Sequence, residues 1–313
     1  MNQAPMGQAR LAVRLPNHLG DACMALPALE LLAARCNPLT LVGKPWAAAL
    51  FEGHGWPVVA LHGDNGTQRT QLREAFVAGT PMLLLTNSFS TAMDARLAKL
   101  KPIGFATDGR GLLLHRAIPV APYAELHMVA YYRALAATLT GANERLPLRI
   151  NLRVSESARA RALALLAAAG VAAPFVVLCP VAIGLHHGKV KAWDGFGRLA
   201  TDLQASGQRV VAMPGPGETD AVRAAVPTAT ILAESDVGTF AAVLTQAALA
   251  VANDSGAGHV AAAVNVPLLS IFGVTDPART QPWGPHVVRV GGANGWPDYA
   301  SVRGAVFGTL GIA

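Results

Sequence analysis

Cysteine is scarce in this chain of 313 residues, and its three cysteines are widely spaced. Cys23, Cys36 and Cys179 each lie within an apolar stretch. A disulfide framework needs paired cysteines and a metal site needs clustered ligands, so the sequence predicts neither. A reducing compartment fits this pattern best.

Charged residues are also few: they make up 14% of the chain, against 52% hydrophobic residues. That balance excludes a mainly disordered chain and suits buried parallel sheets covered by alanine-rich helices. Twenty-five Lys and Arg against nineteen Asp and Glu give a net charge of +6, which favours anionic small substrates or an anionic lipid headgroup. The basic runs with interleaved aromatic residues that a nucleic-acid groove requires are missing, so no nucleic-acid partner is predicted.

Two kinds of apolar segment are missing as well. No uninterrupted apolar run is long enough to span a bilayer. The first ten residues are polar with no apolar core behind them, so we expect no secretion signal and a cytoplasmic protein. At this length, two domains of ordinary size are the first expectation.

The most informative stretch that is present, residues 249–263, predicts a strand, a tight turn and a helix. A short apolar run leads into the turn and an alanine-rich segment follows it. Asp254, Ser255 and Gly256 lie at the turn, where amide groups at a helix N-terminus can bind phosphate, and His259 can add a donor one turn later. The alternative is that Asp254 and Ser255 only cap the helix and that His259 is a satisfied, partly buried histidine.

A second turn of this kind follows the first predicted strand, residues 11–16. Asp21 lies at the start of the next predicted helix, residues 22–35. Ligands of open α/β sheets bind at the carboxyl ends of the strands, so this carboxylate is placed to take a proton from a substrate hydroxyl. The alternative is an acidic residue favoured there only by the helix dipole.

In the second half, the loop over residues 181–191 follows a buried strand and carries Lys189 and Lys191. Lysine is a compact point charge, so this loop suits a diphosphate. His186 and His187 suggest a metal site, but they have no nearby carboxylate and we discount it.

Three further polar residues lie just beyond predicted strands. Asn87 and Ser88 follow a buried strand at residues 81–86, and their alternative role is helix capping. Glu218 follows the turn at residues 214–217 and is placed like the acidic residue that binds ribose hydroxyls; an exposed residue at a helix start is the alternative.

Strands alternate with helices throughout both halves, which predicts an α/β fold of two Rossmann-like doubly wound domains. We expect the first domain to span residues 1–152 and the second residues 153–313. The link lies at residues 143–152, which include Pro147.

Several motifs, taken in order, resemble those of the lipopolysaccharide ADP-heptose heptosyltransferases, glycosyltransferase family 9. The first runs from Arg14 to Asp21 and continues with Leu26-Pro27-Ala28-Leu29, and the second is Asn253-Asp254-Ser255-Gly256 with His259. Two further segments resemble the heptosyltransferase II branch: Leu85-Thr86-Asn87-Ser88-Phe89, and His127-Met128-Val129 with Tyr132. Lys191, two residues before Trp193, resembles the phosphate-side lysine, and Glu218 the ribose-side glutamate.

The resemblance implies a GT-B fold, with two domains facing across a cleft, and an inverting transfer of heptose from ADP-heptose to the inner core of lipopolysaccharide. It implies no metal and no cofactor. It implies that Asp21 and Lys191 are catalytic residues. The residues implied to bind the nucleotide sugar are Glu218, Asp254, Ser255, Gly256 and His259, and those implied to bind the acceptor are Asn17, Asn87 and Ser88.

The implied partners are the nucleotide-sugar donor, the lipid A and inner-core acceptor, and a weak peripheral contact with the inner face of the inner membrane. The chain departs from the family at Gly184–Val190, where Lys189 is an alternative to Lys191, and at Pro16-Asn17-His18. The final helix, expected at residues 299–311, is one that in the family packs back on the first domain. The alternative functions are a GT-B sugar-nucleotide epimerase and a noncatalytic nucleotide-sugar binding protein.

Overall fold

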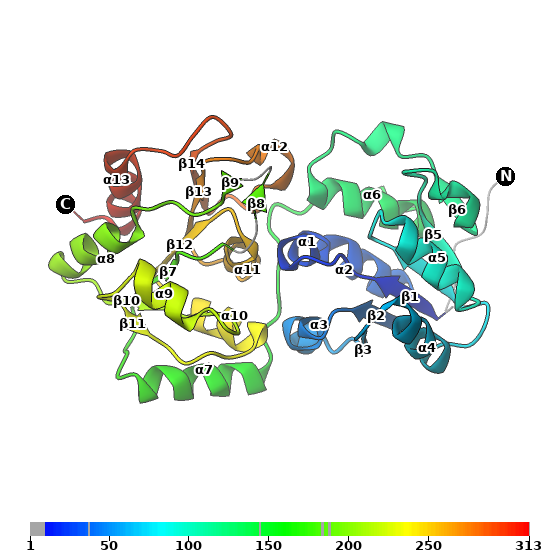
Figure 1. The fold of residues 1–313 in the computed structure, drawn as a ribbon, viewed down its shortest axis with the longest axis horizontal. Helices are drawn as coiled ribbons and strands as arrows, with labels where there is room; N and C mark the ends of the chain where they lie inside the picture. Colours follow the sequence, from blue (N-terminus) through cyan, green and yellow to red (C-terminus); the bar gives the residue numbers. More distant parts are fainter. Residues whose placement is uncertain (1–9, 37, 144, 183–184, 187–188, 313) are drawn as a thin grey trace. The chain divides into compact units, whose positions relative to one another are not determined.

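The computed structural model describes residues 10–36, 38–143, 145–182, 185–186 and 189–312. They form two compact units (Figure 1). The first unit contains residues 10–48 and Gly55–Pro147, and the second contains Ala49–His54 and the residues from Leu148 onward. The chain therefore changes unit at residue 147 rather than at 152, and a short earlier segment belongs to the second unit.

The first unit is built on a sheet of six parallel strands in the order β3-β2-β1-β4-β5-β6. Its central strands are apolar and buried, as expected for a parallel sheet covered on both faces. The strands are β1 (Leu11–Arg14), β2 (Leu39–Gly43), β3 (Val58–Ala60), β4 (Pro81–Leu84), β5 (Lys101–Phe105) and β6 (Arg116–Ile118).

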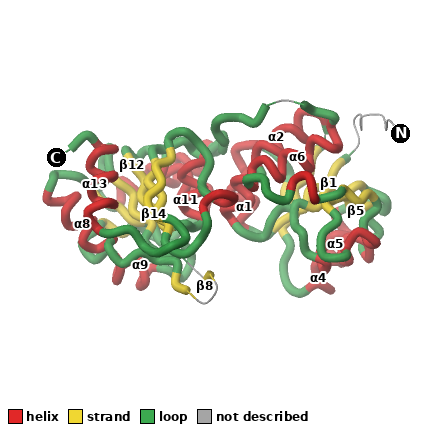
Figure 2. Tube along the Cα trace, turned by 90° about the horizontal axis from the view of Figure 1, so that it is seen from above, coloured by secondary structure: helices red, strands yellow, loops and turns green. Residues whose placement is uncertain are grey.

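Helices cover both faces of this sheet, with α2 and α6 on one side and α4 and α5 on the other (Figure 2). The single helix predicted at residues 22–35 is two helices that meet at Ala25, because Pro27 favours a new helix start there. The helices that begin in this unit are α1 (Leu19–Met24), α2 (Leu26–Arg35), α3 (Trp46–Phe51), α4 (Asn65–Ala75), α5 (Phe89–Leu97) and α6 (Met128–Thr140).

The second unit repeats the architecture, with six parallel strands in the order β11-β10-β7-β12-β13-β14. A short antiparallel pair, β8 (Leu185–His186) and β9 (Lys189–Val190), lies in the loop after β7. The strands of the sheet are β7 (Val176–Cys179), β10 (Val210–Ala212), β11 (Thr230–Ile231), β12 (Leu249–Asn253), β13 (Leu268–Phe272) and β14 (Val287–Gly291).

The final helix, α13, lies in this second unit. Its buried residues Val302, Val306 and Phe307 pack into the same core as strands β7, β12 and β13. The expected packing on the first domain stays a prediction. The other helices here are α7 (Glu156–Ala168), α8 (Phe196–Ala205), α9 (Thr219–Ala225), α10 (Val237–Leu244), α11 (Gly256–Ala263) and α12 (Pro277–Thr280), and α13 spans Tyr299–Leu310.

If the strands of each sheet are numbered from one to six along the chain, both sheets have the order 3-2-1-4-5-6. The order reverses between β1 and β4 in the first unit and between β7 and β12 in the second. In open α/β sheets, ligands bind at the carboxyl ends of the strands beside such a reversal. The segments that follow these four strands are therefore where functional side chains are expected.

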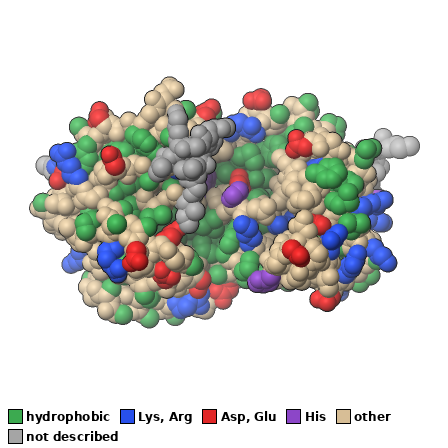
Figure 3. Space-filling view, in the orientation of Figure 1, with side chains coloured by type: hydrophobic (Ala, Val, Ile, Leu, Met, Phe, Trp, Pro, Cys, Tyr) green, Lys and Arg blue, Asp and Glu red, His purple; other side chains and the backbone are tan. Residues whose placement is uncertain are grey.

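No helix in the described part of the chain is long and apolar enough to cross a membrane. On the face shown in Figure 3, Lys and Arg side chains are interspersed with acidic ones. The basic side chains behind the net charge of +6 thus form no single stripe on that face.

Candidate functional sites in the two units

Asp21 lies in the first turn of α1, directly after the loop that follows β1. The hydroxyl of Tyr132, a residue of α6 that is 3% exposed, donates a hydrogen bond to Asp21 Oδ1 over 3.2 Å. Burial raises the pKa of Asp21 above its usual value, while the Tyr132 hydrogen bond and the nearby His18 partly oppose that rise. A carboxylate with a raised pKa is a stronger base, as proton abstraction from a hydroxyl requires.

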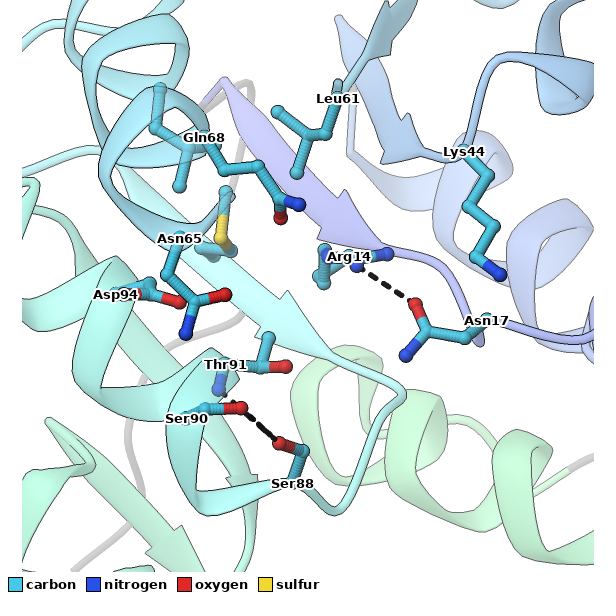
Figure 4. A pocket seen from close by; sticks show the side chains of 12 residues that line it. Arg14, Asn17, Lys44, Leu61, Asn65, Gln68, Ser88, Ser90, Thr91 and Asp94 are labelled. Carbon is cyan, nitrogen blue, oxygen red and sulfur yellow. Dashed lines mark hydrogen bonds between the residues drawn. The ribbon is translucent and has the colours of Figure 1, made fainter. Parts of the chain in front are cut away.

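The second segment at this edge follows β4. Asn87 exchanges hydrogen bonds with the hydroxyl of Tyr131 and accepts one from Arg110. Ser88 is the N-cap of α5 and accepts from the Thr91 amide at 3.4 Å, so the capping role considered for Ser88 is present. Asn17, after β1, accepts a hydrogen bond from Arg14 at 2.9 Å (Figure 4).

Arg110 holds the segment after β4 in place. Its guanidinium is fully buried and donates to the carbonyl oxygens of Phe105 and Thr86 at 2.9 and 2.6 Å. These bonds fix the backbone from which Asn87 and Ser88 project. A single arginine in an irregular stretch gives no sequence signal for this role.

In the second unit, Asp254 follows β12 and is only 7% exposed. Its Oδ2 accepts a hydrogen bond from the Thr275 hydroxyl at 2.7 Å and lies 3.3 Å from Lys191 Nζ. Two residues from separate loops, after β7 and after β13, thus hold this carboxylate. The sequence predicted Lys191 and Asp254 as site residues but not Thr275, because nothing in the sequence shows that the two loops meet.

The capping alternative is wrong for both Asp254 and Ser255. Ser255 is the N-cap of α11, yet its side chain makes no capping hydrogen bond. The buried Ser255 hydroxyl has no hydrogen-bond partner among the described residues. The start of α11, at Gly256, therefore has the uncapped amide end and positive dipole that favour an anion.

Asn253, the last residue of β12, is fully buried and connects three segments. Its Oδ1 accepts from the Trp193 amide at 3.0 Å and its Nδ2 donates to the Pro180 carbonyl at 2.7 Å. The two bonds fix both ends of the loop that carries Lys191. Asn253 belongs to the second sequence motif but was assigned no role from it; a polar residue that ends a wholly apolar strand was the available signal.

Glu218 and His259 lie on two different helices of the second unit. Glu218 is the N-cap residue of α9, after β10, and its carboxylate accepts from the Gly215 amide at 3.0 Å. His259 is a buried residue of α11. The side chain of Lys189 and the whole of Gly184 and His187 lie outside the described residues, so the choice between Lys189 and Lys191 stays a prediction.

The cysteines are poor candidates for covalent chemistry. Cys23 and Cys179 are buried, and burial raises the pKa of each thiol to about 12. A thiol with so high a pKa is protonated near neutral pH and is a weak nucleophile. Across the described ranges, no group of three or more His, Cys, Asp and Glu side chains could hold a metal ion.

Comparisons of the sequence and of the fold with known proteins identify the family of this chain. The sequence model of Glycosyltransferase family 9 (heptosyltransferase) matches residues 57–304. Lipopolysaccharide heptosyltransferase 3 of Escherichia coli is 34% identical over 131 residues, which are 39% of this chain. The matched stretch spans little more than a third, 37%, of that relative.

Solved structures show the same fold over nearly the whole chain. E. coli ADP-heptose LPS heptosyltransferase II superposes with a TM-score of 0.75 at 24% identity, covering 96% of this chain and 97% of that one. E. coli heptosyltransferase WaaC with ADP gives 0.72 at 20% identity, covering 96% and 99%. The predicted α/β fold of two Rossmann-like units, GT-B, is confirmed. The family model covers most of the chain, and the chain therefore belongs to glycosyltransferase family 9, the heptosyltransferase family.

Proposed function

We propose that this glycosyltransferase moves a heptose from ADP-heptose to the inner core of lipopolysaccharide, with inversion at the transferred carbon. The family membership and the lipopolysaccharide heptosyltransferase among its relatives support heptose transfer to lipopolysaccharide. The names of the similar solved structures, an ADP-heptose LPS heptosyltransferase and a heptosyltransferase with ADP, support the nucleotide donor. The observation that carries the chemistry is the Lys191–Asp254 pair beside the uncapped start of α11. It is an anion-binding arrangement at the strand reversal of the second unit.

The second unit binds the donor in this proposal. The Lys191 ammonium and the amides at Ser255 and Gly256 stabilise the charge that develops on the diphosphate as ADP leaves, and His259 assists them. Asp254 holds Lys191 in place before the donor arrives. Glu218, after the neighbouring strand β10, binds the ribose hydroxyls.

The first unit supplies the base. As the acceptor oxygen attacks C1 of the heptose, Asp21 takes the hydroxyl proton, the new C1–O bond forms, and the C1–O bond to the diphosphate breaks. Asn17, Asn87 and Ser88 bind the acceptor sugar. One displacement inverts the configuration and needs no covalent intermediate. The proposal includes no metal and no cofactor.

The acceptor is anchored in a membrane, so we place the enzyme in the cytoplasm with a peripheral contact at the inner face of the inner membrane. The net charge of +6 supports an attraction to anionic lipid. Flotation with anionic vesicles tests this contact. Binding at low salt that is lost at high salt is expected, and no binding at low salt would contradict it.

The experiment that tests the function measures ADP release from ADP-heptose, with and without a truncated lipopolysaccharide acceptor. Release that depends on the acceptor, and a product that carries heptose in inverted configuration, are expected. Turnover of the donor without acceptor would favour an epimerase. ADP binding without any turnover would favour a noncatalytic binding protein.

A further inference from the structure

The final helix, α13, begins against the loop that carries Lys191. Tyr299, the first residue of α13, stacks on the indole of Trp193, which follows Lys191 by two positions. The two rings are nearly parallel, with 6° between their planes and 6.0 Å between their centroids, an offset-stacked pair. Trp193 is only 4% exposed. The start of α13 therefore forms part of the wall that encloses the end of this loop.

Three further contacts enclose the indole of Trp193. Its Nε1 donates a hydrogen bond to the carbonyl oxygen of Pro297, just before α13, at 3.2 Å. Phe196 of α8 meets the indole edge-on, with 5.5 Å between the centroids. Gly195 lies so close to the same ring that the Cβ of an alanine there would overlap it. Close packing of this kind leaves the indole little freedom, so a change in any of its walls displaces it.

Tyr299 is in turn held by charged residues of α8 and α13. Its hydroxyl donates to Asp202 Oδ2 at 2.7 Å, and the same oxygen accepts a hydrogen bond from Arg303 Nε at 3.2 Å. The guanidinium of Arg198 lies 4.0 Å from the centroid of the Tyr299 ring, a cation–π arrangement. These contacts tie the start of α13 to α8 and fix the orientation in which the tyrosine ring meets Trp193.

The position of Lys191 depends on this packing. Its ammonium binds a phosphate as a point charge, without the rigid fork of an arginine, so the position of its backbone decides where the charge lies. Functional groups need to be held within about 0.5 Å of their productive positions by the packing around them. The nearby backbone is fixed at Trp193, whose amide donates to Asn253 and whose ring is held by Tyr299.

We propose that the stack of Tyr299 on Trp193 positions Lys191, so that the lysine ammonium meets the donor diphosphate. Tyr299 is then a positioning residue: it touches no substrate and acts only through Lys191. The donor role of Lys191 belongs to the proposed function, on which this inference rests. Removing the Tyr299 ring should therefore weaken ADP binding only while Lys191 is present.

A double-mutant cycle on ADP binding to the full chain, measured by titration calorimetry, tests the proposal. Tyr299→Leu removes the stack and should weaken ADP binding about three- to tenfold, as expected for the loss of an aromatic pair. In the Lys191→Met background, the same substitution should weaken binding further by less than about 1.5-fold. Tyr299→Phe keeps the stacked ring and loses only the hydroxyl, so it should restore binding to within about 1.5-fold of the natural protein.

The matched control is Phe307→Leu. Phe307 is an aromatic residue of the same helix and the same hydrophobic core, but the partner of its ring is the guanidinium of Arg303, at 3.8 Å. This variant should lower the free energy of unfolding in urea and leave ADP binding to the folded protein unchanged. A purely structural role of Tyr299 would give Tyr299→Leu the same pattern.

Gly195→Ala is an independent variant, because the added methyl group displaces the indole while the Tyr299 side chain stays intact. It should weaken ADP binding in the natural background and have no further effect beside Lys191→Met. If Tyr299→Leu does not fold, this variant carries the test.

Three results would overturn the positioning role alone: unchanged ADP binding in Tyr299→Leu, an equal loss in Tyr299→Phe, or an undiminished loss in the Lys191→Met background. Unchanged ADP binding in Lys191→Met itself would remove the proposed donor role of Lys191, and the positioning role with it. Whether the natural protein transfers heptose is seen separately, in the ADP-release assay.

Discussion

The two units share one strand order but have different chemistry at the strand reversal. In the first unit, Asp21 has the neutral hydroxyl of Tyr132 as its hydrogen-bond partner, and burial raises its pKa. In the second, Asp254 lies against the ammonium of Lys191 beside an uncapped helix. The fold sets where functional side chains lie, whereas the nearest partner of each carboxylate sets what it can do.

Removing the carboxylate of the first unit should have the largest effect. In Asp21→Asn the side chain keeps its size but cannot accept the acceptor proton, so we expect kcat to fall by about 10²–10⁴-fold. Acceptor-dependent ADP release measures it. Asp108→Asn, at an exposed position with a φ of 48° that asparagine tolerates, is the control and should keep full activity. Full activity of Asp21→Asn would remove the proposed base.

Removing the cation of the second unit should come next. Lys191→Met loses the charge that stabilises the leaving diphosphate, and we expect kcat/KM to fall by about 10²–10³-fold. The exposed Arg209 provides the control variant Arg209→Met. If Lys191→Met transfers heptose at the natural rate, Lys189 or the helix amides carry this role instead.

Asn253 tests whether the loop with Lys191 depends on buried hydrogen bonds. Asn253→Ala leaves the Trp193 amide and the Pro180 carbonyl without their partner, which should lower the free energy of unfolding of the second unit by about 1–3 kcal/mol. Urea unfolding followed by tryptophan fluorescence measures it. The exposed Asn151 serves as control, and Asn151→Ala should change stability by less than about 0.5 kcal/mol.

The smallest effect is expected from Tyr132→Phe, which removes the hydrogen bond that lowers the pKa of Asp21. The pKa of Asp21 then rises further above its usual value. Because only the ionised carboxylate accepts a proton, the fall of kcat/KM toward low pH should begin at a higher pH than in the natural protein. Tyr123→Phe, at a ring that packs on Phe105, should leave the pH profile unmoved. An unshifted profile in Tyr132→Phe would show that the bond does not tune the base.

The strand, turn and helix predicted at residues 249–263 are confirmed as β12 and α11, because a fully apolar strand and an alanine-rich helix have strong local patterns. The edge strands β6 and β14 were not predicted. Their residues are partly exposed, so they lack the continuous apolar run of a central strand. Local pattern thus located the central strands of each sheet and missed one edge strand of each.

The sequence indicated the residues of the candidate sites but not the contacts that they make. Strand ends indicated Asp21, Lys191 and Asp254, and the family resemblance gave them roles that residue chemistry alone left open. The pairing of Lys191 with Asp254 and the hydrogen bond from Tyr132 join residues far apart in the chain, so only the fold reveals them.

The account assigns donor binding to the second unit and the base to the first. The most direct test of these two roles is the dissociation constant of ADP, measured by titration calorimetry for the natural protein, Asp21→Asn and Lys191→Met. The account predicts that Lys191→Met weakens ADP binding at least about tenfold and that Asp21→Asn changes it by less than about twofold. Equal losses in the two variants, or a larger loss in Asp21→Asn, would contradict the assignment of the donor to the second unit and of the base to the first.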